Sequence, residues 1–147
     1  MGRFRSILAS ILALVMVFVV SCAPQQAAKP PVYSPSQLEI IAEYKGDLLS
    51  LRDRMSELEQ LIVDRKWVDV ETFIHGPLGD LRRDMSYVTR NLDDREQKTA
   101  RRKSQALFSD LEAIDAAAAE ADYSEAVEKY GEAIVDFDAF LDLIPSA

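Results

Sequence analysis

The sequence predicts an all-α protein, and most simply an up-down-up-down four-helix bundle over residues 36–147. Apolar residues recur at steps of three and four through this stretch, and nothing in it alternates with a period of two. Glycines are few, and four of the six prolines precede residue 36. A domain of about 110 residues can enclose one hydrophobic core. Four amphipathic helices with short connections bury their apolar sides best in such a bundle, with three-helix or dimeric arrangements as alternatives.

Residues 1–21 have the features of a cleaved bacterial lipoprotein signal peptide. Two early arginines form a positive segment, and residues 7–20 are almost wholly apolar but shorter than the ~20 residues of a spanning helix. Val19 and Ser21 then precede Cys22, the only cysteine, in the pattern of a lipobox. We expect cleavage before Cys22 and lipid attachment to its thiol. An ordinary signal peptide with a chance cysteine and an uncleaved anchor are the alternatives.

Residues 22–35 are predicted to be a Pro-rich tether between the lipid and the folded domain. Such segments favour extended conformations of ~3.1 Å per residue, so residues 23–35 would reach ~30–40 Å. We expect no packed structure here. Each buried methylene of the lipid adds ~0.8 kcal/mol of membrane affinity, which would hold the domain at a membrane surface.

The first predicted helix begins at Ser36, which forms a capping box with Glu39. Its apolar side follows steps of three and four, as in an antiparallel bundle. The residues on this side are Ile41, Tyr44, Leu48, Leu51, Met55, Leu58 and Ile62.

The second predicted helix runs from Trp67 to Leu92 after a very short connection, so it should lie antiparallel to the first. Gly76 and Pro77 interrupt it, and a break or kink is expected because proline lacks a backbone donor and clashes with the previous turn. Its apolar residues are Trp67, Val70, Ile74, Leu78, Leu81, Met85, Val88 and Leu92.

Two further helices complete the predicted bundle. The third starts near Asp93 or Asp94, and its alanines at 116–119 permit close approach of a neighbouring helix. Its apolar residues are Leu107, Leu111, Ile114, Ala118 and Ala121. The fourth is capped by Ser124 and stopped by Pro145. Its apolar residues are Val127, Tyr130, Ile134, Phe137, Leu141 and Ile144.

Charge and missing motifs argue against an enzyme and against nucleic acid as a partner. Without the signal peptide, the chain has 15 basic and 25 acidic residues, so its net charge is near −10. Such a charge disfavours binding to the phosphate backbone of nucleic acid. The sequence has no Gly-rich phosphate loop, no catalytic triad pattern and no haem-attachment motif, so we expect no cofactor and no small-molecule substrate. A single histidine, His75, is a weak surface metal candidate with Glu71 and Asp80 one turn away, or else a solvated residue beside the break.

Basic residues gather in two short runs, which stand out in an acidic protein. The candidates for a docking patch are Arg82, Arg83, Arg101, Arg102 and Lys103. The connection near Asp93 would bring both runs toward one end of the bundle, where they could meet an acidic protein partner. Ordinary solvated helix surface is the alternative.

The run from Trp67 to Arg83, WVDVETFIHGPLGDLRR, resembles the signature of the PsbQ family of photosystem II. In that family, a W-x-x-V-x-x-F-I-x-G-P-L-G-x-L-R run lies in the second helix. We expect the matching residues to serve mainly packing and the shape of the break. They are Trp67, Phe73, Ile74, Gly76, Pro77, Leu78 and Gly79. The lipobox is similar to that of the cyanobacterial branch. Plant members use a long N-terminal region instead, which residues 23–35 are too short to replace.

The resemblance implies a non-catalytic extrinsic subunit, lipid-anchored at the lumenal face of the thylakoid membrane. Its partners would be the photosystem II core and other lumenal extrinsic subunits. It would support retention of calcium and chloride at the manganese cluster of that complex, with no cofactor of its own. The alternative is an envelope or periplasmic helical lipoprotein that acts as a spacer or adaptor, which leaves the Trp67–Arg83 run unexplained.

Overall fold

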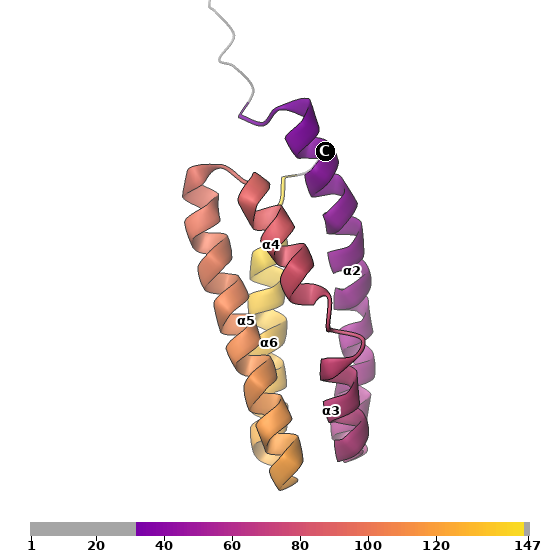
Figure 1. Cartoon of the computed structure of the whole chain (residues 1–147). Coiled ribbons are helices and arrows are strands. Elements are labelled where there is room, and N and C mark those ends of the chain that lie inside the picture. The colour runs from indigo at the N-terminus through magenta and orange to yellow at the C-terminus, as the bar shows by residue number, and fades with distance from the viewer. Residues whose placement is uncertain (1–31, 146–147) are drawn as a thin grey trace, which may run out of the picture. The chain divides into compact units, whose positions relative to one another are not determined.

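A computed structural model of the chain describes residues 32–145, which contain five helices and no strand (Figure 1). The helices are α2 (Pro35–Val63), α3 (Trp67–His75), α4 (Leu81–Asn91), α5 (Asp94–Glu120) and α6 (Tyr123–Leu141). The all-α prediction is confirmed. The predicted signal peptide, the Cys22 lipidation site and most of the tether lie outside the described residues. Within 32–145, no helix is both long and apolar enough to cross a membrane.

The helices form a four-sided bundle in which α3 and α4 together occupy the place of the predicted second helix. Figure 1 shows α2 running one way, α3 and α4 returning, α5 reversing and α6 returning again. The helix α2 packs on α3, α4 and α6, and α5 packs on the same three helices, most extensively on α6. The up-down-up-down arrangement is therefore the one that the apolar spacing predicts.

The break in the second helix falls where Gly76 and Pro77 predict it. The helix α3 ends at His75, and α4 begins at Leu81. A Cβ atom on Gly76 would lie 2.9 Å from the backbone oxygen of Thr72, which is too close for any side chain. Glycine at this position therefore lets the chain turn tightly against the last turn of α3.

The cap of α2 is Ser34 rather than the predicted Ser36, two residues earlier, and the helix begins at Pro35. Ser34 Oγ accepts from the backbone N–H of Gln37, and the Gln37 side chain accepts from the Ser34 N–H at 2.9 Å. Pro35 occupies the first helical position. Proline suits this position because its fixed φ is helical and its missing N–H would have no intrahelical partner.

The end of the predicted tether is packed, contrary to expectation. The hydroxyl of Tyr33 donates to Glu96 of α5 and accepts from the backbone N–H of Asp93 at 3.3 Å. Burial and the hydrogen bond with Glu96 raise the pKa of Tyr33 to about 12, so the hydroxyl stays protonated at ordinary pH. Tyr33, just before the cap of α2, therefore attaches this end of the chain to the connection between α4 and α5.

Aspartate caps both C-terminal helices. Asp93 Oδ1 accepts from the N–H groups of Arg95 and Glu96 at 2.8 and 3.0 Å, which confirms the predicted start of α5. Asp122 caps α6 by accepting from the N–H of Glu125 at 3.1 Å, so the prediction of Ser124 as the cap is wrong. Ala121 ends α5 in the left-handed conformation. The chain therefore turns at once, and α6 begins at Tyr123 with Asp122 in the capping position.

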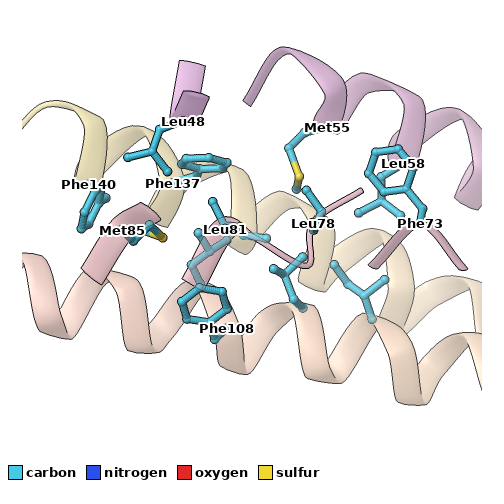
Figure 2. Close-up of a cluster of buried hydrophobic side chains, with 14 of the residues drawn as sticks. Leu48, Met55, Leu58, Phe73, Leu78, Leu81, Met85, Phe108, Phe137 and Phe140 are labelled. Carbon is cyan, nitrogen blue, oxygen red and sulfur yellow. The ribbon is translucent and has the colours of Figure 1, made fainter. Parts of the chain in front are cut away.

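The core follows the predicted apolar sides of the first three helices except at Ala121, which is exposed because it forms the left-handed end of α5. Figure 2 shows side chains from all four sides of the bundle meeting in one cluster, with Leu48 beside Phe137 and Met55 beside Leu78. The most deeply buried large residues include Leu48, Met55, Leu58, Leu81, Met85, Leu107, Ile114, Phe137 and Phe140.

The predicted apolar side of α6 is partly wrong. Val127 is 43% exposed, whereas Ala126 and Ala133 are fully buried. Small residues allow α6 to approach α5 closely, so its buried side is centred on the alanines and on Phe137. The apolar spacing alone favoured the larger Val127.

Candidate functional site

A groove of about 490 Å³ between α4 and α5 carries a concentration of positive charge that is unusual in this acidic chain. Within residues 32–145, its lining contains three arginines and no carboxylate. Polar hydroxyl and amide groups and one aromatic ring fill the rest. The lining residues are Arg82, Ser86, Thr89, Arg90, Arg101, Ser104, Gln105 and Phe108.

The position of Arg82 is set by an aromatic ring on the opposite wall. The Arg82 guanidinium carbon lies 3.9 Å from the centre of the Phe108 ring, within the range of a cation–π interaction. Arg82 Nη2 also lies 3.5 Å from Glu112 Oε1, but both side chains are largely exposed, so this ion pair stabilises little. The ring holds the charge at the groove while leaving the guanidinium accessible to a partner.

The structure separates the five predicted basic residues instead of joining them into one patch. Only Arg82 and Arg101 line the groove. Arg83 pairs with Asp80 and Asp84, each at 3.0 Å, on the side toward α2. Neighbouring residues on a helix point about 100° apart, so Arg82 and Arg83 cannot share a face.

The other two basic residues of α5 also leave the groove. Lys103 Nζ lies 2.8 Å from Asp136 Oδ1 on α6, and Arg102 contacts Thr99 on its own helix. Arg90 also lines the groove, but it has no cation next to it in the sequence and so was not predicted. Its spacing of eight residues from Arg82, with Ser86 midway, is the helical pattern that would have found it.

His75 lies at the edge of a neighbouring depression that shares Arg82 and Phe108 with the groove. Its Nε2 atom is 3.1 Å from both oxygens of Asp115 on α5. The hydrogen-bond partner of His75 is therefore Asp115 and not the expected neighbours Glu71 and Asp80. Among the described residues, no cluster of three or more His, Cys, Asp or Glu side chains is arranged to hold a metal ion.

The motif residues of the second helix mostly serve packing. Phe73 and Leu78 are buried in the core, and Trp67 and Ile74 pack against it. Gly79, like Gly76, lies against backbone: a Cβ there would meet the Gly76 oxygen at 3.1 Å. These residues thus lie in the core or at the break between α3 and α4.

A buried carboxylate on the other side of α5 was not predicted. Asp110 is 9% exposed, and its Oδ2 atom has no hydrogen-bond partner. Burial raises the pKa of Asp110 above its ordinary value, and the negative charges of Glu132 and Asp136 on α6 raise it further.

Replacing Asp110 with asparagine is expected to stabilise the fold at neutral pH by about 1 kcal/mol, because a buried charge without a partner is removed. The folded state of the unsubstituted chain binds this proton more tightly than the unfolded state does. Its stability should therefore rise as the pH falls through the raised pKa toward the ordinary value, and the advantage of Asp110→Asn should shrink there. Urea titrations at neutral and acidic pH measure both effects. An advantage that does not change with pH would contradict this account.

Comparison with known proteins agrees with the motif and the fold. The family model PsbQ, described as oxygen evolving enhancer protein 3, matches residues 3–145. The chain is 43% identical to CyanoQ of Synechocystis sp. (strain PCC 6803) over 148 aligned positions, which cover 100% of this chain and 99% of that protein. The chain thus belongs to the PsbQ family of photosystem II extrinsic subunits.

Proposed function

We propose that this chain docks on the lumenal side of photosystem II through the basic groove between α4 and α5. It does so as a non-catalytic subunit, anchored in the thylakoid membrane by a lipid on Cys22. Docked there, it helps the complex retain the calcium and chloride of its manganese cluster. Other lumenal extrinsic subunits are its further partners.

The observation that carries the proposal is the charge of the groove. Three arginines converge on it in a chain whose mature part has a net charge near −10. Complementary charge guides two proteins to one orientation and speeds their encounter, so the groove favours an acidic surface as its partner. A subunit that binds only the assembled complex also stabilises that complex by mass action. A more stable complex should in turn lose its bound calcium and chloride more slowly.

The double substitution Arg82→Glu with Arg101→Glu is expected to weaken binding to photosystem II about tenfold, since it reverses two of the three positive charges that line the groove. The measurement is co-purification of photosystem II with the tagged full-length chain from detergent-solubilised thylakoid membranes. The same membranes, assayed for oxygen evolution in media poor in calcium or chloride, should lose more activity with the double variant than with the unsubstituted chain.

A matched control separates the groove from net charge. Lys98→Glu with Arg102→Glu changes the charge equally on α5, but neither residue lines the groove. This control should bind nearly as well as the unsubstituted chain. Equal loss in both variants would show that only the overall charge matters, and recovery of envelope proteins without photosystem subunits would refute the proposed function. Mass spectrometry of the N-terminal peptide tests acylation of Cys22 directly.

A further inference from the structure

A second groove, of about 570 Å³, lies between α5 and α6 and has the opposite charge. Because α4 and α6 pack on different sides of α5, the two grooves flank this helix. Four carboxylates line the second groove together with an exposed valine and a glycine. These residues are Asp110, Glu128, Glu132, Asp136, Val135 and Gly131.

Negative charge in this groove exceeds the positive charge that the chain itself supplies. Lys129 Nζ lies 2.8 Å from Glu132 Oε2, and Lys103 Nζ lies 2.8 Å from Asp136 Oδ1. These pairs occupy two of the four carboxylates. Glu128 and Asp110 remain, and Asp110 is nine-tenths buried with an oxygen that no donor reaches. Such a group costs free energy unless a positive charge approaches it, so the groove favours a cationic ligand.

The wall of the groove on α6 suits a polypeptide rather than an ion. Gly131 and Val135 line the groove, and Val127, one turn before Gly131 and just outside the lining, continues the same side of α6. The two valines are 43% and 64% exposed, and a Cβ on Gly131 would meet nothing within 4 Å. An apolar strip with an open glycine accommodates the aliphatic part of a side chain or a closely approaching backbone. Within residues 32–145, no set of ligands is arranged for a metal ion.

We propose that the groove between α5 and α6 docks a segment of a neighbouring protein that carries lysine or arginine. The aliphatic stem of that side chain lies on Val135 and Gly131, and its charged end approaches Asp110 and Glu128. Long cationic side chains are built for this, since their stems cover apolar surface while their ends remain polar. The proposal goes beyond the basic groove, because it gives the chain two docking surfaces of opposite charge on one helix.

Site-specific photo-crosslinking in thylakoid membranes tests the proposal with the full-length chain. A benzophenone amino acid is placed at Val135, in the acidic groove, or at Gln105, in the basic groove. Val135 is expected to capture a peptide with at least two lysines or arginines close together. Capture from Gln105 but not from Val135 would overturn this inference and leave the proposed function intact. Absence of capture from both positions would overturn both.

A pair of opposite charges at one position distinguishes electrostatic docking from a steric effect. Val135→Lys is expected to lower co-purification of the captured partner at least about fivefold, whereas Val135→Glu should preserve or increase it. Val68 on α3, which is 74% exposed, provides matched controls as Val68→Lys and Val68→Glu, and neither should change binding. Equal losses from Val135→Lys and Val135→Glu, or no loss from Val135→Lys, would overturn the inference.

Discussion

Replacing Phe137 with alanine is expected to lower the free energy of unfolding by about 3–5 kcal/mol. Phe137 is fully buried near the middle of the bundle and points into the cluster that includes Leu48 of α2 and Met85 of α4 (Figure 2). Its removal would leave a cavity with walls from several helices. Those helices can relax only partly, because each is also held by contacts along its whole length. Urea titration followed by far-ultraviolet circular dichroism measures the loss.

Val135→Ala, two residues away on the same helix, is the matched control. Val135 is 64% exposed, so its truncation should change stability by less than about 0.5 kcal/mol. If Phe137→Ala cost no more than this control, the packing of α6 in the core would be wrong. A change in the slope of the titration would instead indicate that the variant no longer unfolds in one step.

Gly76→Ala is expected to destabilise the fold by about 1–3 kcal/mol, through crowding at the break between α3 and α4. The added Cβ would lie 2.9 Å from the Thr72 backbone oxygen, and that oxygen cannot turn aside because it accepts the Gly76 N–H at 2.9 Å. The break must therefore open or shift. The midpoint of thermal unfolding should fall, by about 4–8 °C for each kcal/mol in a domain near this size.

Gly46→Ala is expected to change stability in the opposite direction and is therefore the control. Gly46 lies in the interior of α2, where a Cβ would meet nothing within 4 Å. Alanine should stabilise the helix by about 0.5–1 kcal/mol, because it loses less backbone freedom on folding. If both substitutions stabilised the protein, the close approach at Gly76 would be refuted.

Local patterns predicted the architecture well, because they record the same forces that build it. Steps of three and four gave the buried sides of α2, α4 and α5, and the Gly76–Pro77 pair gave the break. The capping residues of the helices were predicted less accurately. Ser34 and Ser36 are both good capping residues, and only the preference of Pro35 for the first helical position decides between them.

The docking surfaces were harder to predict, since they depend on how helices face one another. Arg82 and Arg83 are adjacent in sequence but point to different sides of α4. Arg82 and Arg101 lie on different helices and meet only because α4 and α5 pack together. The acidic groove was not predicted, because the sequence does not distinguish Asp110 from an exposed aspartate and its burial depends on the packing of α6. Val127 was assigned to the core because its size outweighed the alanines in the pattern.

Tyr33 determines where mechanical force enters the folded chain. A pull arriving at Val32 passes through the Tyr33 hydroxyl to Asp93 and Glu96 as well as into the first turn of α2. The force is thus shared between the first turn of α2 and the connection between α4 and α5, so it does not pull α2 off the bundle one turn at a time. Peeling breaks contacts in sequence, whereas a shared load strains many contacts together and meets more resistance. If the N-terminus is anchored to the membrane, as proposed here, Tyr33 thereby distributes the force from the anchored segment over two parts of the bundle.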